Sequence, residues 1–129
     1  MAKNKPHRLG DLQLRIMKVL WERREATVAE VLDTLDDADA SLAYTTIATM
    51  LRKMETRGLV AHRAEGRSFI YRARVAAEDV SRSMANHLVD RLFEGSLLEA
   101  VNHLLSSREV SRDELRQLEK LIAERKKKL

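Results

Sequence analysis

Apolar and polar positions between residues 43 and 58 recur with the spacing of an α-helix that is buried along one side. The apolar positions follow the i, i+3, i+4, i+7 spacing of a packed face, and they are Ile47, Met50, Leu51 and Met54. Hydroxyl and cationic side chains occupy the other face, namely Thr45, Thr49, Arg52, Lys53 and Thr56. Gly58 follows, and glycine commonly supplies the left-handed residue at which a helix ends. We therefore predict a core-anchored helix with a hydroxyl-rich and cationic front.

Two helical patterns precede this segment. The first runs from residue 10 or 11 to residue 24, and its inward positions are Leu12, Ile16, Met17, Val19 and Leu20, with Trp21 as a core anchor near its end. The second opens with Thr27 and Glu30, which have the spacing of a capping box. Acidic residues between positions 36 and 39 are expected to end this second helix.

After Gly58 the pattern changes to strands. Residues 59–64 and 68–75 are interpreted as two strands, the second rich in β-branched and aromatic side chains, and a Gly lies between them at position 66. This arrangement predicts a β-hairpin. Three helices followed by a basic hairpin are the element order of a winged helix-turn-helix.

Helical spacing returns after residue 76 and continues in three segments to the end of the chain. They span residues 78–94, 96–105 and 111–127, and Ser111 with Glu114 repeats the capping-box spacing. Three short helices bury little apolar surface alone, so their apolar stripes are expected to pack against a second copy of the chain. The residues assigned to this dimer surface are Val80, Met84, Leu88, Leu92, Leu115, Leu118 and Ile122.

The predicted architecture is therefore mainly α and has three parts. Residues 1–8 form a basic tail, and residues 9–75 form an N-terminal winged helix-turn-helix of three helices and a two-stranded wing. Residues 76–129 form a small helical dimerisation domain.

Composition narrows the function classes. The 129 residues contain one Pro and four Gly, and 34% are charged, which favours a mostly helical protein. There is no Cys, which excludes disulfides, thiolate metal sites and cysteine catalysis. The four histidines do not form a metal-binding pattern, and no phosphate-binding loop or nucleophile motif occurs. We expect no metal, no cofactor and no enzymatic activity. We also expect a cytoplasmic protein, because neither a membrane span nor a signal peptide is evident.

The charge distribution says more than the net charge of +4. Residues 11–39 hold four Lys/Arg against eight Asp/Glu, whereas residues 40–74 hold seven Lys/Arg against two Glu. The basic excess therefore lies on the hydroxyl-rich helix and the hairpin, as expected for a surface that binds nucleic acid.

Several stretches of the chain match a known family. The strongest are Met17-Lys-Val-Leu-Trp21, the run from Thr46 to Met54 with the following Arg57-Gly-Leu-Val60, and Phe69-Ile-Tyr71. With these stretches, residues 9–129 resemble the penicillinase repressor family, which includes the methicillin-resistance and copper-homeostasis repressors. The resemblance implies a homodimeric winged-helix repressor that binds a short palindromic operator and blocks transcription.

The resemblance assigns base contacts to the N-terminal half of the third helix and further contacts to the wing. The resemblance and the basic residues of the helix and hairpin together give the expected DNA-binding residues, which are Tyr44, Thr45, Thr46, Thr49, Arg52, Lys53, Arg63 and Arg67. Tyr44 fits two roles, stacking near the DNA backbone or capping the helix. Family members often carry a cation where this chain has Ala48 and another where it has Thr45, so the operator sequence stays open.

Two departures from the family bear on regulation. Antibiotic-responsive members are inactivated when a membrane sensor-protease triggers cleavage of an Asn-Phe bond, where this chain has Ala100-Val101. Copper-responsive members carry a Cys-rich tail, and this chain has no Cys. The releasing signal therefore stays open, with proteolysis as one candidate. The alternative function is a winged-helix module that binds another protein without specific DNA binding.

Overall fold

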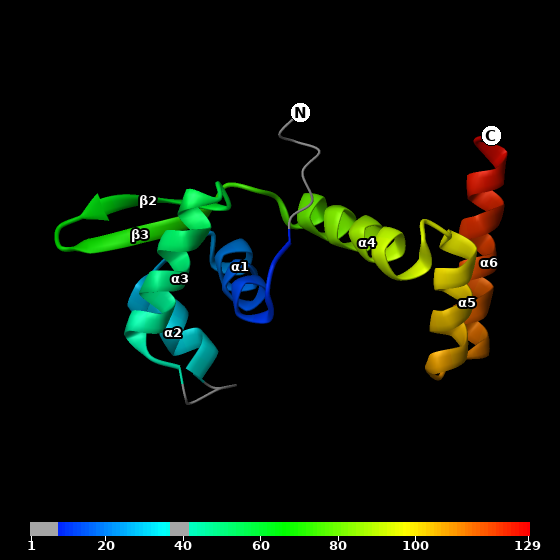
Figure 1. Ribbon diagram of the computed structural model, residues 1–129, viewed down its shortest axis with the longest axis horizontal. Coiled ribbons are helices and arrows are strands. Elements are labelled where there is room, and N and C mark those ends of the chain that lie inside the picture. The colour runs from blue at the N-terminus through cyan, green and yellow to red at the C-terminus, as the bar shows by residue number, and fades with distance from the viewer. Residues whose placement is uncertain (1–7, 37–41) are drawn as a thin grey trace. The chain divides into compact units, whose positions relative to one another are not determined.

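The computed structural model describes residues 8–36 and 42–129 (Figure 1). Contacts divide the chain into two compact units, the first ending at Asn86 and the second beginning at His87. In chain order, the described elements are α1 (Asp11–Arg23), β1 (Glu25–Thr27), α2 (Val28–Asp36), α3 (Tyr44–Thr56), β2 (Val60–Glu65), β3 (Ser68–Ala73), α4 (Ala77–Phe93), α5 (Leu97–Ser107) and α6 (Arg112–Lys127). The prediction of a mainly helical winged helix-turn-helix is confirmed. The predicted tail, except Arg8, and the acidic positions 37–39 lie outside the described residues.

Helices α1, α2 and α3 enclose the core of the first unit. Its fully buried side chains include Ile16, Met17, Leu20, Val31, Ile47, Leu51, Met54 and Val60. Trp21 packs against this core, and its Nε1 donates to the carbonyl oxygen of Val75, 2.9 Å away. The faces predicted to be apolar are therefore the buried ones, and the core holds α3 with its polar face outward.

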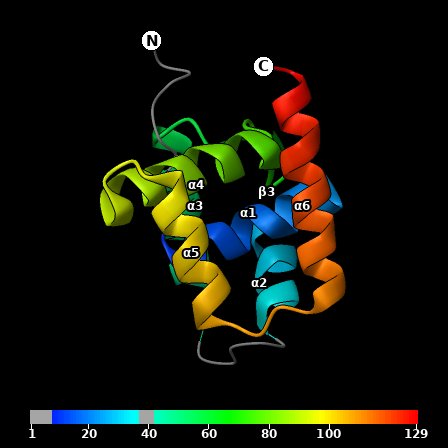
Figure 2. The ribbon, with the colours of Figure 1, turned by 90° about the vertical axis from the view of Figure 1, so that its right-hand side faces the viewer.

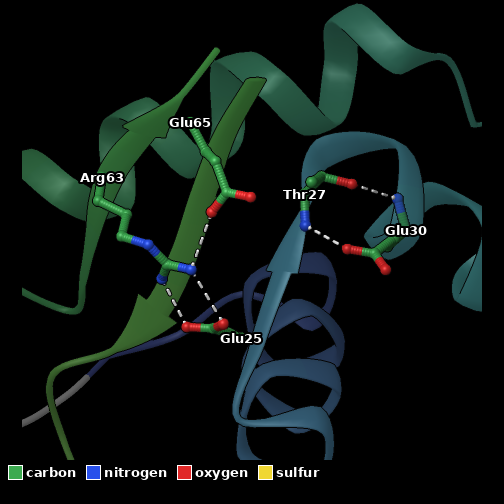
Figure 3. Close-up of polar contacts among 5 residues, drawn as sticks. All are labelled: Glu25, Thr27, Glu30, Arg63 and Glu65. Carbon is green, nitrogen blue, oxygen red and sulfur yellow. Dashed lines mark hydrogen bonds and ion pairs between the residues drawn. The ribbon is translucent and has the colours of Figure 1, made fainter. Parts of the chain in front are cut away.

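A reciprocal cap fixes the start of α2. The Thr27 N–H donates to Oε1 of Glu30 over 2.8 Å, and the Glu30 N–H donates to Oγ1 of Thr27 over 3.1 Å (Figure 3). These two bonds satisfy backbone donors that the first turn of a helix leaves unpaired. The bond from the Thr27 N–H holds the pKa of the Glu30 carboxyl below its usual value. The capping box predicted from the sequence is confirmed.

Gly58 ends α3 in a left-handed conformation, with φ of +81°. Its N–H donates to the carbonyl of Glu55, and the next N–H, of Leu59, donates to the carbonyl of Met54. This pair of bonds is the Schellman motif, and it turns the chain directly into β2.

Gly58→Ala is expected to lower the free energy of unfolding by about 1 kcal/mol, because a Cβ is disfavoured at positive φ. The loss comes from backbone strain and not from a clash, since a Cβ there would meet nothing within 4 Å. Urea unfolding of the two proteins measures the difference. The comparison variant is Gly58→Asn, because asparagine adopts the left-handed region more readily than alanine and should recover part of the loss. Equal midpoints for the wild type and Gly58→Ala would contradict the prediction.

A three-stranded antiparallel sheet with the order β1-β3-β2 completes the first unit. The hairpin of β2 and β3 was predicted, but β1 was not, because three residues are too few to show a strand period. In the pairing register, Ala26 and His62 both lie opposite Tyr71. Alternate residues of a strand point to opposite faces. Ala26, His62 and Tyr71 therefore share the face toward the core and α3, while Glu25 and Arg63 lie on the outer face.

The second unit consists of the end of α4 together with α5 and α6, which run in opposite directions (Figure 2). Serine caps begin both later helices: Ser96 Oγ accepts from the Glu99 N–H and Ser111 Oγ accepts from the Glu114 N–H. Large apolar side chains of this unit stay exposed, and they include Leu88, Leu92, Leu97, Leu98, Leu104, Leu115, Leu121 and Ile122. No helix in the described part of the chain is long and apolar enough to cross a membrane.

Candidate nucleic-acid interface

The outward face of α3 carries most of the predicted DNA-binding side chains. Tyr44, Thr45, Thr46, Thr49, Arg52 and Lys53 are all exposed. On the opposite face, Ile47, Leu51 and Met54 have no exposed surface. This division gives a rigidly held helix whose hydroxyl and cationic groups are free to contact a partner.

Tyr44 is the first residue of α3 and does not cap it. The N-cap position belongs to Ala43, and no side chain accepts a hydrogen bond there. Tyr44 is 53% exposed. Of the two roles considered for Tyr44, contact with a partner fits this placement better than capping.

A groove of about 470 Å³ separates α3 from the hairpin. Its lining residues are Val28, Tyr44, Ala48, Arg52, Glu55, His62, Arg67, Phe69 and Tyr71. Burial raises the pKa of the Tyr71 phenol, which stays protonated at the groove's inner wall. Glu55, His62 and Phe69 were not predicted as site residues, although the alternation of β2 places His62 on the face toward α3.

Arg63 lies on the outer face of the sheet, away from this groove. Its Nη1 and Nη2 donate to the two carboxylate oxygens of Glu25 over 2.6 and 3.1 Å, and Nη2 also donates to Glu65 over 3.3 Å (Figure 3). These contacts join β2 to β1, the outer strand on the far side of β3. Arg63, expected to contact DNA, already has both of its terminal nitrogens engaged within the chain.

The two ends of this ion pair shift one another's proton affinity. The hydrogen bonds from Arg63 hold the pKa of Glu25 below its usual value of 4.5, and Glu25 raises the pKa of Arg63. A lowered carboxyl pKa stabilises the folded state above the unfolded pKa, and that stabilisation is lost as pH falls through the folded pKa.

Arg63→Ala is therefore expected to lower the free energy of unfolding near neutral pH. The difference from the wild type should shrink as pH falls below 4.5, because Glu25 becomes protonated in both proteins. Urea unfolding across this pH range measures it. Arg82→Ala, which removes an arginine from an exposed pair with Glu78 on α4, is the matched control. A difference that stays constant with pH would contradict the assignment.

Arg57 is a second cation of the basic region that is used within the chain. Its Nη1 donates to Oε1 of Gln13 and its Nη2 donates to the carbonyl oxygen of Arg8. Of the seven Lys/Arg between residues 40 and 74, Arg57 and Arg63 are therefore engaged within the chain. Arg52, Lys53 and Arg67 have no ion pair among the described residues.

Metal ligands are not brought together in the part of the chain that the structure describes: no three His, Asp or Glu side chains there could hold an ion.

A family model described as penicillinase repressor matches residues 9–124. The chain belongs to the penicillinase repressor family. The chain is 27% identical over 118 residues to the penicillinase repressor of Bacillus licheniformis, and the match covers 92% of this chain and 91% of that protein. It is 35% identical over 120 residues to the transcriptional regulator BlaI of Mycobacterium tuberculosis, covering 91% of this chain and 84% of that protein.

A solved structure also resembles part of this chain. The solution structure of the DNA binding domain of the repressor BlaI is 31% identical, with a TM-score of 0.51 over 58% of this chain and 90% of that domain. The family and the winged-helix fold predicted from the sequence are both confirmed.

Proposed function

We propose that the protein is a transcriptional repressor that binds operator DNA with the exposed face of α3 and the tip of the hairpin. The observation that carries the proposal is the front of α3, a hydroxyl and cationic surface on a helix whose back is fully buried. Family membership and the winged-helix fold support it. A helix held this firmly can enter the major groove without loss of core packing.

The two halves of α3 have different roles in this proposal. Threonine hydroxyls both donate and accept hydrogen bonds, and the threonine methyl can contact a thymine methyl. The base-reading residues are therefore those of the N-terminal half, namely Tyr44, Thr45, Thr46 and Thr49. Arg52 and Lys53 follow in the C-terminal half, where they bind phosphates and contribute affinity for any sequence.

The wing contributes through Arg67 at its tip, next to Gly66. Gly66 has φ of +62°, which lets the hairpin turn tightly and places Arg67 among the residues that line the groove beside α3. Arg63 has a different role, because its pair with Glu25 braces the outer face of the sheet. We thus assign the phosphate contact of the wing to Arg67 and the support of the wing to Arg63.

The second unit forms the interface of a homodimer in this proposal. Most of its leucines, and Ile122, are exposed within one protomer, and exposed apolar patches commonly mark protein–protein contacts. A second copy covers such a surface and presents two copies of α3 to a two-fold symmetric operator. Of the predicted dimer residues, Leu88, Leu92, Leu115 and Ile122 are exposed, and Met84 and Leu118 are partly buried. Val80 is only 1% exposed, so we leave it out of this surface.

A repressor acts where the DNA is, so we propose a cytoplasmic location and no catalytic role. Residues 76–129 carry dimerisation in this scheme, and a signal that separates the two copies would release the operator. Such a signal could come from a membrane sensor-protease system that acts on the repressor indirectly.

Selection from a random duplex library tests the proposal without knowledge of the operator. The full-length protein is expected to enrich a sequence with two-fold symmetry, because two copies of α3 read identical half-sites. Failure to enrich any sequence, with no duplex binding at low salt, would instead favour a module that binds another protein.

A further inference from the structure

The groove between α3 and the hairpin contains a contact that the proposed function does not use. Nδ1 of His62 lies 2.7 Å from Oε1 of Glu55, and both side chains are 32% exposed. The His62 ring also stacks on Phe69, with ring centroids 4.3 Å apart and an interplanar angle of 29°. The imidazole is thus held between a carboxylate of α3 and an aromatic ring of β3.

This contact lies where the hairpin leaves the core. On the inner face of β2, Val60 is fully buried, and His62 is the next residue along that face and is exposed. Within residues 8–36 and 42–129, no other side-chain hydrogen bond joins α3 to the hairpin. The rest of the wing, with Arg67 at its tip, extends beyond this point. Among the described residues, the His62–Glu55 bond is therefore the side-chain hydrogen bond that links the base of this extension to α3.

The negative charge of Glu55 opposes DNA binding, whereas its contact with His62 supports the wing. Glu55 is the one acidic residue in the sequence of α3, and it lines the same groove as Arg52 and Arg67. A carboxylate beside DNA repels phosphates, so Glu55 lowers affinity through its charge alone. A carboxylate can only accept hydrogen bonds, so His62 must be the donor in this pair. Glu55 thus has an unfavourable charge for DNA binding and a favourable position for holding the wing.

We infer that Glu55 and His62 are positioning residues for operator binding, whose contact holds the wing at the angle that brings Arg67 to the DNA backbone while α3 occupies the major groove. The inference rests on the proposed function, because it requires Arg67 to contact DNA. It predicts the opposite of simple electrostatics: removal of the Glu55 carboxylate weakens binding although a negative charge has left the DNA-facing side.

Titration of the full-length protein with the selected duplex tests this directly. Glu55→Ala is expected to weaken binding about fivefold, the effect of one partly exposed hydrogen bond. Glu55→Gln should recover most of this loss, because its amide oxygen still accepts from His62. His62→Phe, which keeps an aromatic ring but loses the donor, should match Glu55→Ala. Glu22→Ala makes the same charge change on an exposed position of α1 and should not weaken binding. Glu55→Ala binding as tightly as the wild type, or more tightly, would overturn the inference.

A double-mutant cycle with Arg67→Ala separates positioning from a general loss of fold. Arg67→Ala should weaken binding and lower the slope of log K against log salt by about 0.9 per protomer. In that background Glu55→Ala should cause no further loss, because the wing contact is already absent. A full additional loss would overturn the inference and point to a structural defect. An unchanged affinity in Arg67→Ala would instead overturn the wing contact of the proposed function, a result distinguishable from failure of Glu55→Ala alone.

Discussion

Lys53→Ala is expected to weaken operator binding by about tenfold for each protomer bound, the effect of losing a hydrogen bond to a charged group. Lys53 is exposed on α3 and has no ion pair among the described residues, so its charge is available to a phosphate. Loss of one phosphate contact per protomer should also lower the slope of log K against log salt by about 0.9 per protomer. Fluorescence anisotropy with the selected duplex at several salt concentrations measures both quantities.

The contrast between Lys53 and Thr49 makes this prediction specific. Thr49→Ala should change the preference among operator variants at one base position and leave the salt slope unchanged, because a hydroxyl that reads a base releases no counterion. Lys18→Ala removes the same charge from an exposed position of α1 and controls for net charge. An unchanged salt slope in Lys53→Ala would remove Lys53 from the phosphate contacts.

Leu97→Asp is expected to convert the protein from dimer to monomer and to weaken operator binding about a hundredfold or more. A dimer gains avidity because the second half-site is bound at high effective concentration, and a monomer loses that gain. Leu97 is 68% exposed within the chain, so the substitution removes no packing inside the protomer. It is also the first residue of α5, where an acidic side chain favours the helix.

Sedimentation at micromolar concentration gives the oligomeric state, and titration with the selected duplex gives the affinity. Ser106→Asp controls for charge, because it adds the same charge to α5 on the side opposite Leu97 by helical spacing. Since an acidic side chain in the last turn disfavours the helix, retention of the dimer by this variant is a strict control. Ile122→Asp on α6 provides an independent second variant, since Ile122 is 57% exposed. A Leu97→Asp protein that sediments as a dimer would place the dimer surface elsewhere, and a wild-type monomer would exclude the dimer altogether.

Local patterns predicted the helices and their ends well, since each rests on a physical rule that acts within a few residues. The capping box of Thr27 and Glu30 needs only a spacing of three, and the left-handed turn at Gly58 needs only a residue without a Cβ. The buried face of α3 follows from its period, because one core covers one side of the helix.

Pairings between residues far apart in the sequence could not be predicted, because these rules act only within a few residues. Glu25 pairs with Arg63 across a separation of 38 residues, and β1 is recognisable as a strand only through its partner β3. The sequence alone therefore groups Arg63 with the free cations. The His62–Glu55 contact crosses the turn at Gly58, and nothing in the local pattern of either residue indicates that the two side chains meet.

The most direct test of the central claim is a titration of the full-length protein with two duplexes of equal composition, one carrying the selected symmetric sequence and one scrambled. The comparison is made at about 50 mM and about 200 mM salt, where the electrostatic part of the binding differs strongly. We predict two protomers per symmetric duplex, weaker binding to both duplexes at higher salt, and a preference for the symmetric sequence of about a thousandfold or more. Equal affinity for the two duplexes, or no binding to either at the lower salt, would contradict the assignment of α3 as an operator-reading helix.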